Sequence, residues 1–339
     1  GIFNSRMSVN EDIELSIRMP EVSKVLCSQT DVMINEVTCS NDQVMISGDI
    51  VLHLVYSCND EYEPVAQIAD KIGFSHVMDV RGANSDMDAF VTGNVEDIYI
   101  GVNQNEQGEA RVLFCEAVVN LNVMLMEREH TTLVMDAYSS TYELALIDKE
   151  VEYRDAVANM TAQQTSRLVA TLPNGMPPMA RISAVLVRPV IYQATAGNGM
   201  VTFEGTAVMD VFYIASATGE IRSFRAQPEL SMVIDSPEVT SGCEIFFNVA
   251  MEHMQAVLLG SDGCEVRLTL NVTFSAYDIK KQQVLMSVEQ AGLLENDFAI
   301  YIYITQKGEN LWSVGKQLNV SVEELKRVNP DIDDNPPAG

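Results

Sequence analysis

The sequence GDIVLHLVY, Gly48–Tyr56, is the clearest indication of the fold, because it returns 157 residues later as GTAVMDVFY, Gly205–Tyr213. From Ile50 onward, every second side chain of the first stretch is apolar, and the opposite face carries Asp49 and His53. The second stretch has the same two-residue period. This period predicts a half-buried strand in an antiparallel sheet, with one face turned toward a core.

The repeat extends beyond this strand. Residues 20–56 align without a gap on residues 177–213, with eight identical pairs in 37 positions. A later strand, Ala117–Leu125, matches Val266–Phe274 at a spacing of 149 residues, which places extra loop residues in the first copy around Asn103–Ala110. The sequence therefore predicts two copies of one β-rich domain. The identical pairs are Pro20/Pro177, Ile34/Ile191, Thr38/Thr195, Asn41/Asn198, Val44/Val201, Gly48/Gly205, Val51/Val208 and Tyr56/Tyr213.

The bulk composition indicates a globular protein with more than one domain. A chain of 339 residues, 47% of them apolar, exceeds one typical core. No apolar run is long enough to span a bilayer, and Gly1–Arg6 lack the apolar region of a signal peptide.

The net charge of −27 limits the classes of partner. A nucleic acid or an anionic lipid surface would be repelled by so acidic a protein. We interpret the charge mainly as a source of solubility, with a docking surface for a basic partner as the alternative.

The residues that usually carry catalysis form no recognisable site. The six cysteines include no C-x-x-C pair, which favours free thiols in a reducing compartment and argues against zinc. A duplicated enzyme would have its base in both copies, yet His53 aligns with Asp210. No nucleophile elbow, P-loop or dinucleotide fingerprint occurs. The sequence thus predicts a protein that is not an enzyme, with no catalytic residue, no metal and no cofactor.

The C-terminal end follows a different pattern. Residues 301–304 are aromatic or β-branched and predict a short strand. Asn310 is placed to cap a helix, and Ser321 with Glu324 predicts a capping box for a second helix, which Pro330 ends. The predicted buried stripes are Leu311, Val314 and Leu318 in the first helix, and Val322, Leu325 and Val328 in the second.

This C-terminal unit, Tyr301–Pro330, resembles the LysM family. LysM is a small βααβ module that usually binds polymers containing N-acetylglucosamine, such as peptidoglycan or chitin, and in some proteins binds another protein. We expect the module to be incomplete, because the sequence ends with Asp333–Gly339, before the second strand that the family has. The matching residues are Gly308, Leu311–Ser313, Val320–Leu325 and Asn329–Pro330.

The LysM resemblance implies a ligand groove between the turn before the first helix and the turn after the second. The only tryptophan, Trp312, lies beside the first turn. We expect it to close the small core, with stacking on a sugar or a partner side chain as the alternative. The implied groove residues are Gly308, Glu309, Asn310, Leu311, Asn329, Pro330, Asp331 and Ile332.

The two β copies resemble the SPOCS domain, which occurs in spore-forming Firmicutes. The order of SPOCS repeats followed by LysM resembles the clostridial spore coat-assembly proteins. The residues that carry the resemblance are Glu11–Ile13, Met19–Pro20, Val25–Leu26, Gly48–Tyr56 and Asp136–Ser139 in the first copy, and Leu172–Pro173, Pro177, Ile182 and Gly205–Tyr213 in the second.

These resemblances imply a non-enzymatic scaffold of the spore coat, in the mother-cell cytoplasm at the forespore surface. The implied partner of the LysM-like module is the morphogenetic ATPase that forms the basement layer of the coat. The alternative is a peptidoglycan-binding protein. Sheet edges and apolar faces also offer surfaces for homo-oligomer contacts.

The predicted fold class is mainly β, with two antiparallel β-sandwich-like repeats and a small α/β module of βααβ order. Between the repeats, Lys149–Arg167 is rich in charge and helix formers, and both a short helix and a connecting strand fit its pattern. We expect a first β-domain over 1–135, a connector over 136–171, a second β-domain over 172–286, a linker over 287–298 and an incomplete LysM-like module over 299–339.

Overall fold

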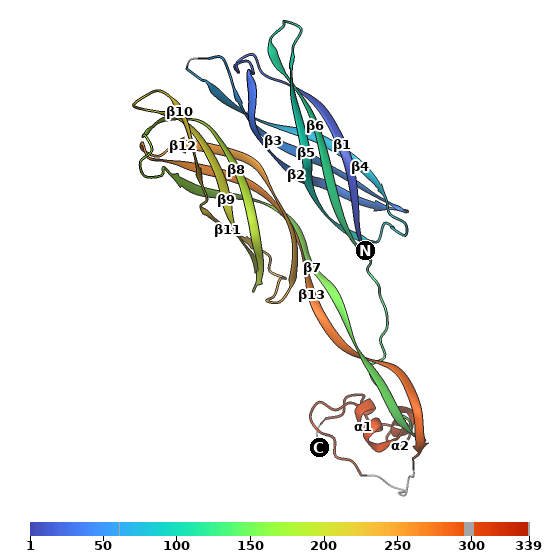
Figure 1. Ribbon diagram of the computed structural model, residues 1–339. Helices are drawn as coiled ribbons and strands as arrows, with labels where there is room; N and C mark the ends of the chain where they lie inside the picture. Colours follow the sequence, from blue (N-terminus) through green and yellow to red (C-terminus); the bar gives the residue numbers. More distant parts are fainter. Residues whose placement is uncertain (61, 295–301, 338–339) are drawn as a thin grey trace. The chain divides into compact units, whose positions relative to one another are not determined.

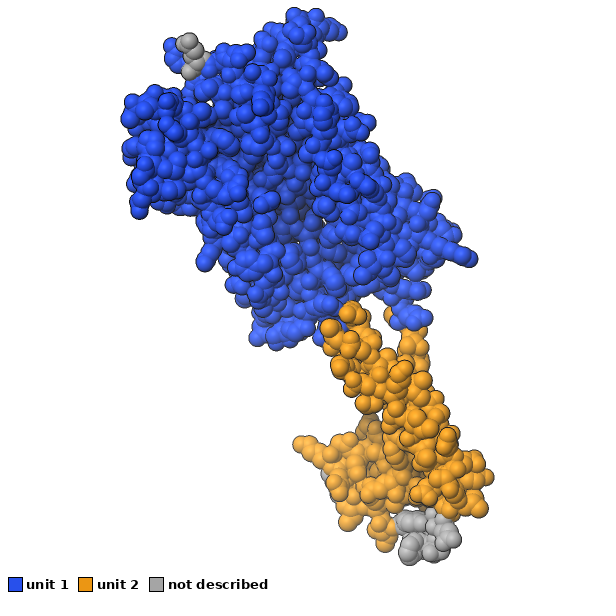
Figure 2. All heavy atoms as spheres, in the orientation of Figure 1, with its two compact units in different colours: residues 1–129, 155–278 blue, residues 130–154, 279–339 orange. Residues whose placement is uncertain are grey.

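The computed structural model describes residues 1–60, 62–294 and 302–337 (Figure 1). The chain is mainly β, its sheets are antiparallel, and two short helices follow the last strand, which confirms the predicted fold class. The chain divides into two compact units (Figure 2). Gly1–Glu129 and Asp155–Asp278 form the first unit, and His130–Arg154 and Ile279–Gly339 form the second.

The first β copy has two three-stranded sheets, ordered β1-β6-β5 and β2-β3-β4. All neighbours in these sheets are antiparallel, and a tight turn joins β2 to β3. The strands are β1 (Ile2–Glu14), β2 (Lys24–Ser40), β3 (Gln43–Ser57), β4 (Val65–Asp79), β5 (Asp88–Gln104) and β6 (Ala110–Met126).

The second β copy repeats this arrangement, with β12-β13-β7 as one sheet and β8, β9, β10 and β11 as the other. The counterpart of β4 is divided at Gln227–Pro228 into two strands that pair with consecutive stretches of β9. The strands are β7 (Tyr142–Thr171), β8 (Met179–Gly197), β9 (Met200–Ala215), β10 (Ile221–Ala226), β11 (Glu229–Asp235), β12 (Glu244–Leu258) and β13 (Gly263–Leu293).

Two segments that the sequence leaves undecided or assigns to a linker are strand. Most of the expected connector is β7, paired with β13, and from Met160 to Ala170 every second side chain of β7 is the less exposed one. β13 extends to Leu293, so the first part of the expected linker over 287–298 is also strand. Long-range pairing along the ladder outweighs the local helix propensity of Lys149–Arg167.

The core of each copy lies between its two sheets, as the alternating pattern predicts. Ile46, Ile50, Leu52, Leu54 and Tyr56 of β3 are at most 1% exposed, and β6 covers them with another row of buried residues. The second copy buries the matching face of β9 in the same way. Its buried residues are Val201, Phe203, Ala207, Met209, Val211 and Tyr213.

The identical tyrosine and proline residues of the repeat form the same hydrogen bond in both copies. The Tyr56 hydroxyl donates to the Pro20 carbonyl oxygen at 3.1 Å, and the Tyr213 hydroxyl donates to the Pro177 carbonyl oxygen at 3.1 Å. Burial raises the pKa of Tyr56 to about 12, so the hydroxyl remains a donor.

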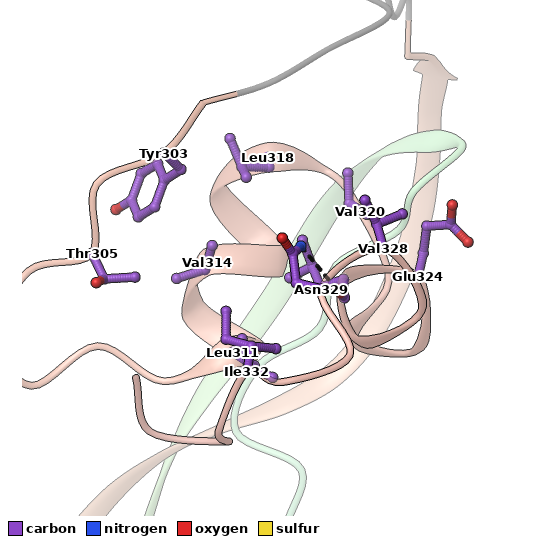
Figure 3. Close-up of a pocket in the computed structure, with 11 residues that line it drawn as sticks. Tyr303, Thr305, Leu311, Val314, Leu318, Val320, Glu324, Val328, Asn329 and Ile332 are labelled. Carbon is purple, nitrogen blue, oxygen red and sulfur yellow. Dashed lines mark hydrogen bonds between the residues drawn. The ribbon is translucent and has the colours of Figure 1, made fainter. Parts of the chain in front are cut away.

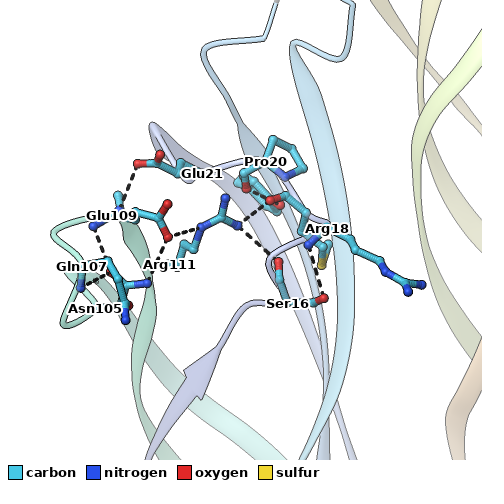
Figure 4. A network of polar contacts seen from close by, with 11 residues as sticks. Ser16, Arg18, Pro20, Glu21, Asn105, Gln107, Glu109 and Arg111 are labelled. Atoms are coloured by element: carbon cyan, nitrogen blue, oxygen red, sulfur yellow. Dashed lines mark hydrogen bonds and ion pairs between the residues drawn. The ribbon is translucent and has the colours of Figure 1, made fainter.

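In the first copy, Arg111 holds the loop that carries Pro20 (Figure 4). Its guanidinium donates to the carbonyl oxygens of Ser16 and Met19, at 3.2 and 2.5 Å, and pairs with the Glu109 carboxylate at 2.9 Å. The Arg111 side chain is 11% exposed, so these contacts are largely shielded from solvent. They fix the loop between β1 and β2 against the start of β6.

The identical glycines of the repeat lie opposite a β-bulge. The pairing of β2 with β3 shifts between Ile34 and Glu36, and the pairing of β8 with β9 shifts between Ile191 and Gln193. A Cβ at Gly48 would lie 2.4 Å from the Met33 carbonyl oxygen, and one at Gly205 would lie 2.3 Å from that of Val190. No side chain fits either position without moving the backbone.

We expect Gly48→Ala to lower the free energy of unfolding by about 1–3 kcal/mol, because the added methyl must displace backbone. Gly73→Ala is the matched control, since its Cβ would meet only the Asp49 carboxylate at an ordinary 3.7 Å. Urea unfolding measures both variants. Equal losses for the two variants would contradict the close approach at Gly48.

The outer face of β3 is buried, although the alternating pattern predicts a half-buried strand with one exposed face. Val51, His53 and Val55 are at most 1% exposed, because the second copy covers them. Val55 packs in a cluster with Ala184 and Leu186 of β8, and Val51 packs with Ala250 of β12. The contact also includes polar groups, among them an ion pair between Lys71 and Glu252 at 3.1 Å.

Two buried titratable groups lie on this covered face. Neither ring nitrogen of His53 has a hydrogen-bond partner in the described structure, and burial, with His253 as a lesser cause, lowers its pKa to about 4. Burial raises the pKa of Asp31 to about 6, against the opposing effects of the Gln29 side chain, the Met251 backbone and Arg188.

These shifts predict opposite pH effects on the free energy of unfolding. Unfolded His53 takes up a proton below about pH 6.5 and folded His53 only near pH 4, so His53 destabilises the fold as the pH falls through this window. Folded Asp31 takes up its proton near pH 6 and unfolded Asp31 near 3.8, so Asp31 stabilises the fold as the pH falls. The two effects partly cancel in the native chain.

His53→Leu should remove only the destabilising effect. On acidification from pH 7 to about pH 4, this variant should gain about 2–3 kcal/mol relative to the native chain. Urea unfolding at a series of pH values measures the difference, and Asp31→Asn should shift the curve in the opposite direction. Parallel pH curves for the native chain and His53→Leu would rule out His53 as a titrating group of the fold.

Candidate functional site

The two helices begin where the sequence predicts. α1 (Leu311–Leu318) has Asn310 as its N-cap, whose side chain accepts from the Ser313 amide at 2.8 Å. α2 (Val322–Val328) has Ser321 as its N-cap, whose hydroxyl accepts from the Glu324 amide at 3.1 Å. Neither helix is long and apolar enough to cross a membrane, and the described residues form no other helix.

Two local expectations are wrong. The reciprocal capping box belongs to α1, where the Asn310 amide donates to the Ser313 hydroxyl; at α2 the Glu324 carboxylate pairs instead with Arg327, at 2.8 Å. The expected strand over 301–304 is also missing from its described part: Tyr301 lies outside the described residues, and 302–304 form no ladder with a described strand. Extended backbone without a pairing partner does not make a sheet.

The inner sides of α1 and α2 line a pocket of about 390 Å³ (Figure 3). Leu311 and Val314 at its base are 2% and 4% exposed, whereas Val328 at its edge is 63% exposed. The pocket is thus an apolar depression open to solvent. Its lining residues are Tyr303, Thr305, Leu311, Val314, Leu318, Val320, Glu324, Leu325, Val328, Asn329 and Ile332.

Three of the eight groove residues implied by the sequence line this pocket: Leu311, Asn329 and Ile332. They come from both predicted turns. The Leu311 amide donates to the Asp334 carbonyl oxygen at 2.9 Å, which ties the first turn to the segment after the second. The structure therefore brings the two turns together, while Pro330 and Asp331 do not line the pocket.

The other implied residues of the first turn have structural contacts. Gly308 has a φ of +92°, a conformation that favours glycine. The Glu309 carboxylate accepts from the Tyr303 hydroxyl at 2.7 Å and from the Gln306 amide at 2.8 Å, and these donors hold the pKa of Glu309 below its usual value. Asn310 caps α1.

The sequence predicts that the apolar stripes of the two helices lie in a core, and in the structure most of these residues form the pocket wall. Val314 is buried as predicted, whereas Leu318 and Leu325 are only half-buried, and all three line the depression. Tyr303, which the sequence predicts in a strand, lines the pocket together with Thr305. The apolar stripe of α2 is the sequence signal that could have identified the pocket. In the structure no residue of α2 is fully buried, so this stripe is left to form a wall of the pocket.

The pocket has the chemistry of a binding surface. Its only carboxylate is Glu324, which Arg327 neutralises at 2.8 Å. The Asn329 amide group donates to the Leu325 carbonyl oxygen at 3.1 Å, which orients its side-chain oxygen within the wall. Among the residues that the structure describes, no group of three His, Cys, Asp or Glu side chains could hold a metal ion. All six cysteines are free thiols.

Comparison with protein families identifies the same region in both β copies. The family model described as SipL, SPOCS domain, matches residues 21–103 and 178–259. These segments contain β2 to β5 up to residue 103 and β8 to β12, so the match repeats on equivalent strands. The chain therefore has a SPOCS-domain match in each copy, which indicates a sporulation-related protein.

No curated protein matches the chain. A solved structure titled "Crystal structure of lipopolysaccharide binding protein" aligns with 80% of this chain and 92% of that chain, at 8% identity and a TM-score of 0.10. A score this low supports no conclusion about fold or function.

We expect Leu311→Ala to destabilise the two helices by about 2–5 kcal/mol, because it removes a buried side chain from the base of the pocket. Hydrogen exchange of the α1 and α2 amides measures this local stability. The control is Val328→Ala, which shortens an exposed residue of the same wall and should leave exchange nearly unchanged. Faster exchange in the control than in Leu311→Ala would contradict the packing described.

Proposed function

We propose that the chain is a non-enzymatic scaffold protein of spore coat assembly. The observation that carries this proposal is the SPOCS-domain match on residues 21–103 and 178–259. The LysM-like module around α1 and α2 docks onto the morphogenetic ATPase of the coat. The setting is the mother-cell cytoplasm at the forespore surface, as the resemblance to coat-assembly proteins implies.

The lining of the pocket supports a protein as the ligand of the module. Seven of its eleven lining residues are Leu, Val or Ile, and Val328 presents apolar surface at the edge. Such a wall suits an apolar side chain of a partner, which loses its contact with water on docking. A sugar polymer, rich in hydroxyl groups, would leave many of its polar groups unpaired there.

Peptidoglycan is the competing ligand. Asn329 favours it, because an amide in the pocket wall is able to hydrogen-bond a sugar hydroxyl or an acetamido group. The same amide is also able to bond the backbone of a peptide. A binding experiment with both ligands therefore decides between the two functions.

We expect the purified chain to bind the purified coat ATPase saturably in isothermal titration calorimetry and not to sediment with purified peptidoglycan. Asn329→Ala should weaken binding about tenfold, the loss of one or two hydrogen bonds, without unfolding the helices. Asn59→Ala, which shortens an exposed asparagine of the first copy, is the matched control. Saturable binding to peptidoglycan with none to the ATPase would falsify the scaffold proposal.

A further inference from the structure

The segment Asp136–Tyr138 contacts α1 although about 180 residues separate them in the sequence. The Tyr138 hydroxyl donates to the Val320 carbonyl oxygen at 3.1 Å, just beyond the end of α1. The Asp136 carboxylate pairs with the Lys316 ammonium group. The segment therefore holds both the helix and the turn that leads to α2.

Gly315 makes this approach possible. It is a buried residue in the middle of α1, where glycine is otherwise a poor helix former. A Cβ at this position would lie 2.6 Å from the Tyr138 hydroxyl oxygen and 2.6 Å from the Val320 carbonyl oxygen. The helix thus has a glycine at the place where the tyrosine hydroxyl approaches its backbone.

Trp312 is part of the same contact. Its ring meets that of Tyr138 edge-on, with centroids 5.3 Å apart and planes at 81°, a favourable aromatic geometry. The Lys316 ammonium group lies 5.7 Å from the centroid of the Trp312 ring. Trp312 is 40% exposed and does not line the pocket. The contacts of its ring are instead with Tyr138 and Lys316.

We propose that Asp136–Tyr138 is a strap that occupies the Trp312 side of α1 within the same chain, so that partner binding is restricted to the pocket side of the module. This inference deepens the proposed function and rests on it for the identity of the partner. The evidence for the strap itself is its contacts with Gly315, Lys316 and Trp312. It extends the module upstream to a segment outside the LysM-like stretch.

The first test uses the native chain. A zero-length carbodiimide joins a carboxylate to an amine only when they are in contact, so treatment should give an Asp136–Lys316 cross-link detectable by mass spectrometry. The cross-link should persist when the coat ATPase is bound. Its absence from the free chain would overturn the strap, and its loss on binding would overturn the claim that this side stays closed.

The second test uses Trp312 as the only tryptophan fluorophore. Tyr138→Ala should raise acrylamide quenching about twofold, because it uncovers one side of the indole, whereas Tyr138→Phe should stay near the native value. Tyr62→Ala, a tyrosine 83% exposed in the first copy, is the matched control. Hydrogen exchange of α1 and α2 is measured on the same variants. Unchanged quenching and exchange in Tyr138→Ala overturn the strap; a change in either supports it.

The binding test is Trp312→Phe, which keeps an aromatic ring in the strap contact. Affinity for the coat ATPase should stay within about twofold of the native chain, because Trp312 lies outside the binding surface. A tenfold loss, with native exchange of the helices, would place Trp312 in the binding surface and overturn the inference. If the native chain does not bind the ATPase, the proposed function fails. Cross-linking and quenching still show whether Asp136–Tyr138 covers this side of α1.

Discussion

The close approach of two backbones at Gly48 and Gly205 is the constraint on which the β copies depend. In each copy a carbonyl oxygen of the bulged neighbour lies where a side chain would begin. A bulge bends its strand and increases the local twist. The bent β2 then passes close to β5 of the other sheet, where a Cβ at Gly93 would meet Val32. The buried faces of β3 and β6 are enclosed between sheets that this bend brings together.

The same strand has a different outer face in the two copies, and this difference makes the pair asymmetric. His53 is covered by the second copy, whereas its counterpart Asp210 forms a two-point ion pair with Arg225, at 2.7 and 2.8 Å. A neutral histidine tolerates burial better than a carboxylate does. The two copies of this strand therefore differ at the matching position, with a covered histidine in β3 and an ion-paired carboxylate in β9.

Local sequence patterns predicted most helices and strands correctly, because these elements depend largely on residues that are close in the sequence. The two-residue period around Ile50, the caps at Asn310 and Ser321 and the stop at Pro330 all act within a few residues. The sequence failed where a distant partner decides: β7 is a strand because β13 pairs with it, and 302–304 lack such a partner. Likewise, three groove residues line the pocket, but their apolar neighbours on the helices form most of it.

The duplication can be read from the sequence because matching residues recur at a fixed spacing, and the alternating strands and the C-terminal helices can be read from the periods of neighbouring residues. The folded chain explains why the repeated residues recur: Tyr56 and Tyr213 reach a proline carbonyl oxygen 36 residues upstream, and Gly48 and Gly205 admit a bulged strand. The contact between Tyr138 and Gly315 is likewise visible only once the chain is folded. Contacts between residues far apart in the chain depend on how sheets bend and pack, and no local period encodes that geometry.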